Sequence, residues 1–196
     1  MRESKATLFI FAGNNGSGKS TIRNLIIDRI GISVNIDPDA LARRINPHQP
    51  EIARVSAGKE AIRLARECIH NFRDFSIETT LSGGYALRLI KEAKANNFEI
   101  ITFYVGLGDP NLNIQRVAIR VKNGGHQIPT KDILRRHHTS FENLLTHMNL
   151  IDNLIVIDNS SLSGEIVLEI DRGDLKYRNS SLPNWVTPIL HQLQSQ

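Results

Sequence analysis

The chain has 196 residues, of which 40% are hydrophobic and 22% are charged. This length favours one domain of α/β size, and the composition excludes a disordered chain or a coiled coil. The apolar run at 8–12 is too short for a membrane span or a secretory signal, and Cys68 is the only cysteine, which excludes an intrachain disulfide and a zinc site built on several thiolates. We therefore expect a cytoplasmic protein without membrane association.

The formal net charge is +4, and its surplus lies in one segment. Residues 114–140 contain six basic residues and one acidic residue. A small anionic ligand held by a local cluster of arginines explains this distribution better than a nucleic acid, whose footprint would spread over a whole face. We therefore do not expect a nucleic-acid partner.

Short apolar runs alternate with segments of helical periodicity. The predicted strands are Thr7–Ala12, Ser33–Asp37, Phe75–Thr79, Glu99–Val105 and Asn153–Asp158. The predicted helices are Lys19–Ile30, Pro38–Ile45, Glu51–Asn71, Gly83–Asn96, Pro110–Asn123 and Thr130–Met148. This alternation is typical of an α/β fold, with a parallel sheet covered by helices on both faces. The core of the domain is expected at about 7–159.

The pattern changes in the C-terminal part of the chain, at about 160–196. Glu165–Asp171 alternates apolar and polar residues, and Gly173 and Asp174 are typical of a turn. We predict an antiparallel hairpin appended to the edge of the sheet. A final helix is expected at Trp185–Leu193.

The first strand leads directly into a glycine-rich loop and then a helix. The loop matches the pattern G-x-x-x-x-G-K-[ST] of a phosphate-binding loop (P-loop) in full, in the context that this pattern requires. Its glycines allow positive φ angles, so that backbone N–H groups converge on phosphate oxygens beside the positive end of the helix. The residues expected to bind nucleotide are Gly13, Asn14, Asn15, Gly16, Ser17, Gly18, Lys19, Ser20 and Thr21.

Two of these side chains have expected roles toward the nucleotide. Lys19 is predicted to reach the β- and γ-phosphates, and the Ser20 hydroxyl to bind Mg²⁺. The chain lacks the D-x-x-G and N-K-x-D patterns of GTPases, so we expect ATP rather than GTP. Its only apolar run ending in aspartate, 154–158, is followed by asparagine, which disfavours a molecular motor.

Acidic residues at the ends of the second and third strands favour a small-molecule kinase. Asp37 and Asp39 follow the second strand, where a carboxylate can take a proton from an acceptor hydroxyl or simply cap the next helix. Glu78 and Thr80 end the third strand, where Glu78 can accept from sugar hydroxyls or from a water on Mg²⁺. A polar strand end in a turn is the alternative for these two residues.

Arginines on two consecutive helices predict a lid over the triphosphate. Arg116 and Arg120 lie four residues apart on one helix face, and Arg135 and Arg136 follow the flexible connection 124–129. Planar guanidinium groups suit phosphate oxygens, and we assign Arg116, Arg120 and Arg136 to the nucleotide. A solvated basic face is the alternative for each arginine.

Four of these features occur in order and together resemble the zeta toxin family of P-loop kinases. They are the loop 13–21, Ile36-Asp37-Pro38-Asp39, Ile77-Glu78-Thr79-Thr80, and 120–129 with its Gly-Gly-His. The resemblance implies phosphoryl transfer from ATP to the 3′-hydroxyl of the sugar in UDP-N-acetylglucosamine. It also implies a small antitoxin protein that blocks the nucleotide site.

The resemblance further implies roles for individual residues. Lys19 is similar to the family's phosphate lysine, Ser20 to its Mg²⁺ ligand, Asp39 to its general base and Arg120 to a lid arginine. The implied acceptor contacts are Asp37, Glu60, Glu78 and Thr80. The chain departs from the family pattern at Ser82, where better-studied members carry an arginine.

We therefore expect an ATP- and Mg²⁺-dependent kinase acting on a sugar nucleotide. Two alternatives stay open from the sequence. One is a kinase for nucleosides or polynucleotide ends. The other is a nucleotide-dependent binding switch or DNA-associated ATPase, which would have no acceptor.

Overall fold

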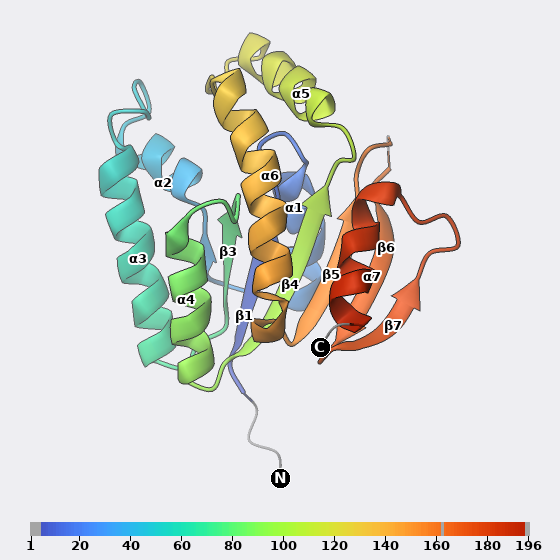
Figure 1. Cartoon of the computed structure of the whole chain (residues 1–196). Helices are drawn as coiled ribbons and strands as arrows, with labels where there is room; N and C mark the ends of the chain where they lie inside the picture. The colour runs from blue at the N-terminus through green and yellow to red at the C-terminus, as the bar shows by residue number, and fades with distance from the viewer. Residues whose placement is uncertain (1–4, 162, 195–196) are drawn as a thin grey trace.

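The computed structural model describes residues 5–161 and 163–194, and it places their strands in one sheet (Figure 1). The strands are β1 (Thr7–Ala12), β2 (Asn35–Ile36), β3 (Phe75–Thr79), β4 (Glu99–Gly106), β5 (Asn153–Asp158), β6 (Glu165–Asp171) and β7 (Asp174–Arg178). Their order is β2-β3-β1-β4-β5-β6-β7. The first five are parallel and the last two antiparallel, which confirms the predicted parallel sheet with an appended hairpin.

The helices cover both faces of this sheet, as predicted. They are α1 (Lys19–Ile30), α2 (Pro38–Ile45), α3 (Arg54–His70), α4 (Gly84–Ala95), α5 (Pro110–Lys122), α6 (Thr130–Thr146) and α7 (Thr187–Gln194). Figure 1 shows α3, α4, α6 and α7 in front of the sheet and α1 behind it. The larger core lies on the side of the four helices and includes Leu8, Ile10 and Ile100. Alternate strand residues, among them Val105 and Ile157, pack with Ile22 of α1 on the other face.

Three predicted elements begin two or three residues later in the structure than predicted. The second strand was expected at 33–37, but its ladder covers only 35–36, because it is an edge strand and Asp37 already caps α2. The third helix was expected from residue 51, but 50–53 form a separate turn and α3 begins at Arg54. The last helix begins at Thr187, after a short 3₁₀ helix at Asn184–Val186.

The hairpin turn lies one residue earlier than predicted. Arg172 and Gly173 occupy its two central positions, with φ of 49° and 85°, and Asp171 pairs with Asp174 across it. A two-residue turn of this twist needs positive φ at both central positions. The prediction placed Asp174 in the turn, whereas Asp174 is the first residue of β7. The predicted C-terminal tail also includes residues 162, 195 and 196, which lie outside the described residues.

Trp185 ties the C-terminal segment to the ends of two central strands. Its ring packs against Gly106, where a Cβ atom would lie only 2.2 Å from the indole. Its Nε1 donates a hydrogen bond to Asp158 Oδ1 at 3.1 Å. The segment after β7, which includes α7, therefore packs on the same face of the sheet as α6 and completes the cover of that face. Among the described residues, no helix combines the length and apolar character needed to span a bilayer.

The register of the central strands brings the sequence motifs to one edge. Phe11 pairs with Glu78 of β3, and Ala12 pairs with both Thr79 and Tyr104. The P-loop that follows Ala12 therefore opens beside the polar end of β3. The topology of the sheet, rather than proximity in the chain, assembles the candidate site.

Candidate active site

The P-loop takes a conformation that only glycine tolerates at its tightest points. Gly13 and Gly16 have φ of 139° and 76°. A Cβ atom on Gly13 would lie 2.1 Å from the carbonyl oxygen of Val105, and one on Gly16 would lie 2.7 Å from that of Asn113. The loop can therefore pass close to the neighbouring backbone and curl its N–H groups toward one point.

Three asparagine side chains hold the loop in place. Asn113 Nδ2 donates to the Asn15 carbonyl at 2.8 Å, and Asn159 Nδ2 donates to the Ser17 carbonyl at 2.7 Å. Within the loop, Asn14 Nδ2 donates to the Ile133 carbonyl at 3.0 Å. These contacts join the P-loop to α5, to the end of β5 and to α6, so that the loop is fixed before any phosphate binds.

Lys19 lies almost fully buried beneath the loop. Lys19 is only 7% exposed, and its Nζ donates a hydrogen bond to the Asn14 carbonyl oxygen at 2.9 Å. Burial lowers the pKa of Lys19, and nearby Glu78, Asp39 and Asp37 oppose that effect. The ammonium group is thus held among carboxylates at the floor of a cavity, where a phosphate can replace its carbonyl partner.

Ser20, Arg23, Asp37 and Glu78 form one connected polar network. Ser20 Oγ donates to Glu78 Oε1 at 2.8 Å. Arg23 Nη1 bridges the two acids, at 2.9 Å from Glu78 Oε2 and 3.3 Å from Asp37 Oδ2. Burial raises the pKa of Glu78, while Lys19, the Ser20 hydroxyl and Arg23 favour its charged form. The ends of β2 and β3 are thereby fastened to the first turns of α1.

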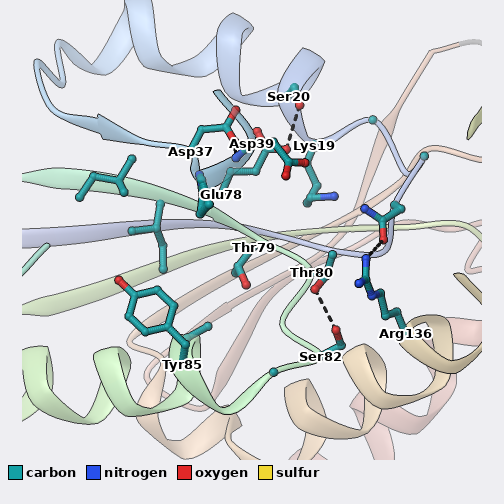
Figure 2. Close-up of a pocket in the computed structure, with 18 of the residues that line it drawn as sticks. Lys19, Ser20, Asp37, Asp39, Glu78, Thr79, Thr80, Ser82, Tyr85 and Arg136 are labelled. Atoms are coloured by element: carbon teal, nitrogen blue, oxygen red, sulfur yellow. Dashed lines mark hydrogen bonds between the residues drawn. The ribbon is translucent and has the colours of Figure 1, made fainter. Parts of the chain in front are cut away.

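Asp37 and Asp39, the two aspartates at the end of the second strand, differ in the contacts of their carboxylates. Asp37 caps α2, since its Oδ1 accepts from the backbone N–H groups of Asp39 and Ala40 at 2.9 and 3.2 Å. Asp39 is exposed, and its carboxylate forms no hydrogen bond or ion pair with any residue the structure describes. Both residues line the cavity, but only Asp39 presents a carboxylate with no structural task (Figure 2).

The cavity has a volume of about 680 Å³ and opens between the strand ends, α2 and the two lid helices. Figure 2 shows Lys19, Ser20 and the acidic residues gathered on one side, with Thr80 and Ser82 on the segment that follows β3. Thr80 Oγ1 and Ser82 Oγ are hydrogen-bonded at 2.8 Å. Of the predicted acceptor contacts, Asp37, Glu78 and Thr80 thus lie in the cavity.

The predicted lid arginines occupy different places. Arg120, Arg135 and Arg136 line the cavity, and Arg136 Nη1 donates to Asn15 Oδ1 of the P-loop at 2.8 Å. Arg116 is not among the lining residues. Its Nη2 donates to the Asn159 carbonyl at 2.9 Å, which places it beside the residue that anchors the loop.

The connection between the two predicted lid helices, α5 and α6, contacts the start of α3. Arg120 Nη2 donates to the His126 carbonyl at 3.3 Å, and the His126 ring contacts the guanidinium of Arg54 at the start of α3. Burial and Arg54 lower the pKa of His126. The connection between α5 and α6 is therefore joined both to Arg120 and to the start of α3.

Glu60 is the one predicted acceptor contact that the fold keeps away from the cavity. It lies on α3 and does not line the cavity; its carboxylate binds Arg63 one turn later, at 2.7 and 2.9 Å. The structure does not bring Glu60 to the other predicted contacts, because the helix turns this residue toward an i,i+3 ion pair on its outer surface.

Comparison with known proteins identifies the family. The family model described as zeta toxin matches residues 1–164. The chain belongs to the zeta toxin family. An uncharacterized protein of Haemophilus influenzae is 39% identical over 125 residues, which cover 64% of this chain and 87% of that protein.

Solved structures share the fold of this zeta toxin family member. The PezAT toxin–antitoxin system of Streptococcus pneumoniae contains a chain with a TM-score of 0.62 and 17% identity, and the match covers 98% of this chain and 80% of that one. The AvrRxo1-ORF1:-ORF2 complex with ATP gives a TM-score of 0.68 and 14% identity, over 90% of this chain and 61% of that one. This chain therefore spans less than two thirds of the AvrRxo1 chain that it matches. The shared architecture is a mainly parallel sheet that carries a P-loop and is covered by helices on both faces.

Sequence reasoning missed three residues of the site in this zeta toxin family member. Arg23 bridges the two strand-end acids, and its only signal was its place one turn after Ser20. Asn113 is fully buried on a helix, and a polar residue at an apolar helical position was its signal. Asn159 follows β5 at the same sheet edge as the other motifs, and this position was the signal for its role at the loop.

Proposed function

We propose that the chain is an ATP- and Mg²⁺-dependent kinase that phosphorylates a hydroxyl of a sugar nucleotide. The observation that carries this proposal is the Asp39 carboxylate, which lines the cavity beside Lys19 and forms no hydrogen bond or ion pair with the described residues. A nucleotide-dependent binding switch has no need for such a group beside a P-loop, whereas in an ATPase the same carboxylate would activate water, so the acceptor assay below separates the kinase from the ATPase. UDP-N-acetylglucosamine is the first acceptor to test.

The proposed reaction is an in-line phosphoryl transfer. The acceptor oxygen forms a bond to the γ-phosphorus while the bond from that phosphorus to the bridging oxygen of ADP breaks. Asp39 takes the proton of the acceptor hydroxyl, and ADP leaves with the bridging oxygen. Lys19 and the lid residues Arg120 and Arg136 neutralise charge on the phosphoryl oxygens, so that catalysis is positioning plus electrostatic stabilisation.

The residues present fit a magnesium ion. Ser20 Oγ lies 2.8 Å from Glu78 Oε1, so a cation there could be held by a lone pair of the hydroxyl oxygen, which keeps its proton, and through a water by the carboxylate. No cluster of three or more histidine, cysteine or acidic side chains forms a metal site among the described residues. This agrees with an ion that takes most of its ligands from phosphates and water. Bound there, Mg²⁺ would supply positive charge between the β- and γ-phosphates.

The cavity suits an acceptor larger than a simple sugar. Its volume of about 680 Å³ falls within the range of small-molecule sites, and Thr80 and Ser82 offer hydroxyls opposite the carboxylates. Hydroxyls that both donate and accept are suited to the alcohol groups of a sugar.

A small antitoxin is proposed as a protein partner. Support comes from the solved relative of Streptococcus pneumoniae, which is described as part of a chromosomal toxin–antitoxin system. A small protein encoded beside this chain should co-purify with it and weaken ATP binding as it is titrated in. If the complex binds ATP as tightly as the free chain does, the antitoxin does not act by blocking the nucleotide site.

The decisive experiment is mass spectrometry of a metabolite extract incubated with the protein, ATP and Mg²⁺. One metabolite should gain one phosphate group, and the Asp39→Asn variant should fail to produce it. Purified UDP-N-acetylglucosamine is tested in parallel. ATP consumption without any phosphorylated metabolite would reject the kinase in favour of an ATPase.

A further inference from the structure

The side chains that line the cavity carry an uneven charge. Five are basic and three are acidic. The acidic ones already have a bridging cation in Arg23, which binds two of them. Four of the basic residues come from the P-loop and the lid, where the triphosphate of ATP would lie. The fifth is Arg43, and it comes from α2.

Arg43 lies on the acceptor side of the cavity. It follows Asp39 by four residues on α2, so the two side chains share one helix face about one turn apart. Arg43 is exposed and forms no ion pair or hydrogen bond with the part of the chain that the structure describes. A molecule whose hydroxyl meets Asp39 therefore has a free guanidinium a few ångströms further along the same wall.

The position of Arg43 is not explained by helix stability. A basic residue in the last turn of a helix stabilises the helix dipole. Arg44 lies in the same last turn and serves that purpose equally, yet Arg44 does not line the cavity. The fold thus directs one of two adjacent arginines into the cavity, and this gives a matched control.

A second wall of the cavity has an unused hydrogen-bonding group. The ring of Tyr85 lines the cavity at the end away from Arg136, as Figure 2 shows. Its hydroxyl oxygen is buried and has no hydrogen-bond partner among the described residues. Burial raises the pKa of Tyr85 to about 12, so this hydroxyl stays a donor at neutral pH. Because a buried donor without a partner is costly, a ligand oxygen would find it available.

We infer that Arg43 is a specificity-determining residue that selects an acceptor carrying a phosphate group in addition to its reactive hydroxyl. The inference rests on the proposed function, whose sugar-nucleotide acceptor already carries phosphate, and it assigns the recognition of that phosphate to Arg43. A guanidinium pairs with phosphate oxygens through two parallel hydrogen bonds, so it distinguishes a phosphorylated molecule from the corresponding neutral alcohol. Tyr85 adds a neutral donor to the lining of the same cavity.

The first test separates neutral from anionic acceptors. A metabolite extract is passed over an anion exchanger, and the flow-through and the salt eluate are each desalted and incubated with the protein and labelled ATP. Label should enter a molecule of the eluate and none of the flow-through. In a defined pair, UDP-N-acetylglucosamine should be phosphorylated and N-acetylglucosamine should not. Transfer to a neutral molecule of the flow-through overturns the inference and with it the sugar-nucleotide acceptor, while kinase activity itself stands.

The second test assigns the selection to Arg43. The KM for the acceptor in the eluate should rise at least tenfold in Arg43→Gln and stay within twofold in Arg44→Gln, while the KM for ATP stays unchanged in both. Arg43→Lys should recover part of the loss. Equal acceptor KM values for the two glutamine variants overturn the inference. If neither fraction accepts phosphate although the protein binds ATP, the proposed kinase itself fails and the Arg43 assignment falls with it.

Discussion

Arg23 and Glu78 form a largely buried ion pair, with Nη1 2.9 Å from Oε2, directly behind the P-loop serine. The same guanidinium reaches Asp37 at 3.3 Å. One side chain of α1 thus sets the positions of two strand ends that lie far from it in the sequence. Burial raises the pKa of the carboxylate that faces Ser20, and Lys19, the Ser20 hydroxyl and this contact oppose that effect.

Substituting Arg23 should shift the pH dependence of the reaction. Burial already raises the pKa of Glu78, and Arg23 lowers it. In Arg23→Gln the pKa of Glu78 should rise further, so the carboxylate protonates at a higher pH and the acidic limb of the kcat profile moves toward neutral pH. Arg29→Gln, an exposed change later on the same helix, is the control and should leave the limb in place. If the acidic limb lies at the same pH in Arg23→Gln and in the parent chain, the Arg23–Glu78 pair has no role in this pH dependence.

Asp39→Asn should remove activity without removing stability. Its carboxylate is exposed and forms no hydrogen bond or ion pair with the described residues, so the melting temperature should stay within about 1 °C of the parent chain. The transfer rate should fall by about 10²- to 10⁴-fold, which is the usual contribution of a general base. Stopped assays with labelled ATP and thermal melts measure the two effects. Near-full activity would show that another group takes the proton.

Asp37→Ala should have the opposite signature. Loss of the cap of α2 costs about 1 kcal/mol, and the Arg23 contact is lost as well. We expect the melting temperature to fall by about 2–4 °C or more. The free energy of nucleotide binding, measured by calorimetry, should change less than the free energy of unfolding does. A variant that melts like the parent chain would contradict the capping role.

Lys19→Met should inactivate the protein and stabilise its fold. The pKa of Lys19 is lowered because the cost of burying its charge exceeds the attraction of the neighbouring carboxylates. A side chain of similar length without charge escapes that cost, so the melting temperature in the absence of nucleotide should rise, on the order of 2–4 °C for 1 kcal/mol. The transfer rate should fall at least about a hundredfold, as for loss of one transition-state donor. A lower melting temperature would mean that the ammonium group is a net source of stability.

Asn159→Ala should loosen the P-loop. The change removes the donor to the Ser17 carbonyl and leaves that acceptor without this partner, at a cost of about 1–3 kcal/mol. We expect the KM for ATP to rise about tenfold or more. Asn71→Ala removes a comparable bond, from Asn71 Nδ2 to the Glu67 carbonyl at 2.9 Å, at the end of α3, and it should leave the KM for ATP unchanged. Equal KM values for the two variants would show that the anchor is dispensable.

The parts of the site that depend on local pattern could be predicted from the sequence. The P-loop requires glycines, a lysine and a hydroxyl at fixed spacing, and β1 has an uninterrupted apolar run, so both follow from the residues alone. The polar ends of β2 and β3 were predicted for the same reason. The carboxyl ends of parallel strands meet at one edge, whatever the length of the connections between them.

The parts that depend on side-chain direction could not be predicted. Asp37 and Asp39 have the same chemistry two residues apart, and only the turn into α2 decides which becomes the cap. Glu60 fits an acid at an approximate spacing, but the phase of α3 directs it to Arg63. Arg23 lies on a helix with polar residues around it, so its inward direction became visible only when α1 had been docked on the sheet.

The lone tryptophan of the chain makes this protein its own spectroscopic probe. Trp185 touches the strand end from which the lid helices depart, and its indole is hydrogen-bonded to the last residue of β5, next to the anchor Asn159. Any movement of the lid on ATP uptake changes the surroundings of that ring. Its emission spectrum should therefore report nucleotide binding in the unlabelled chain, with no second indole to obscure the signal.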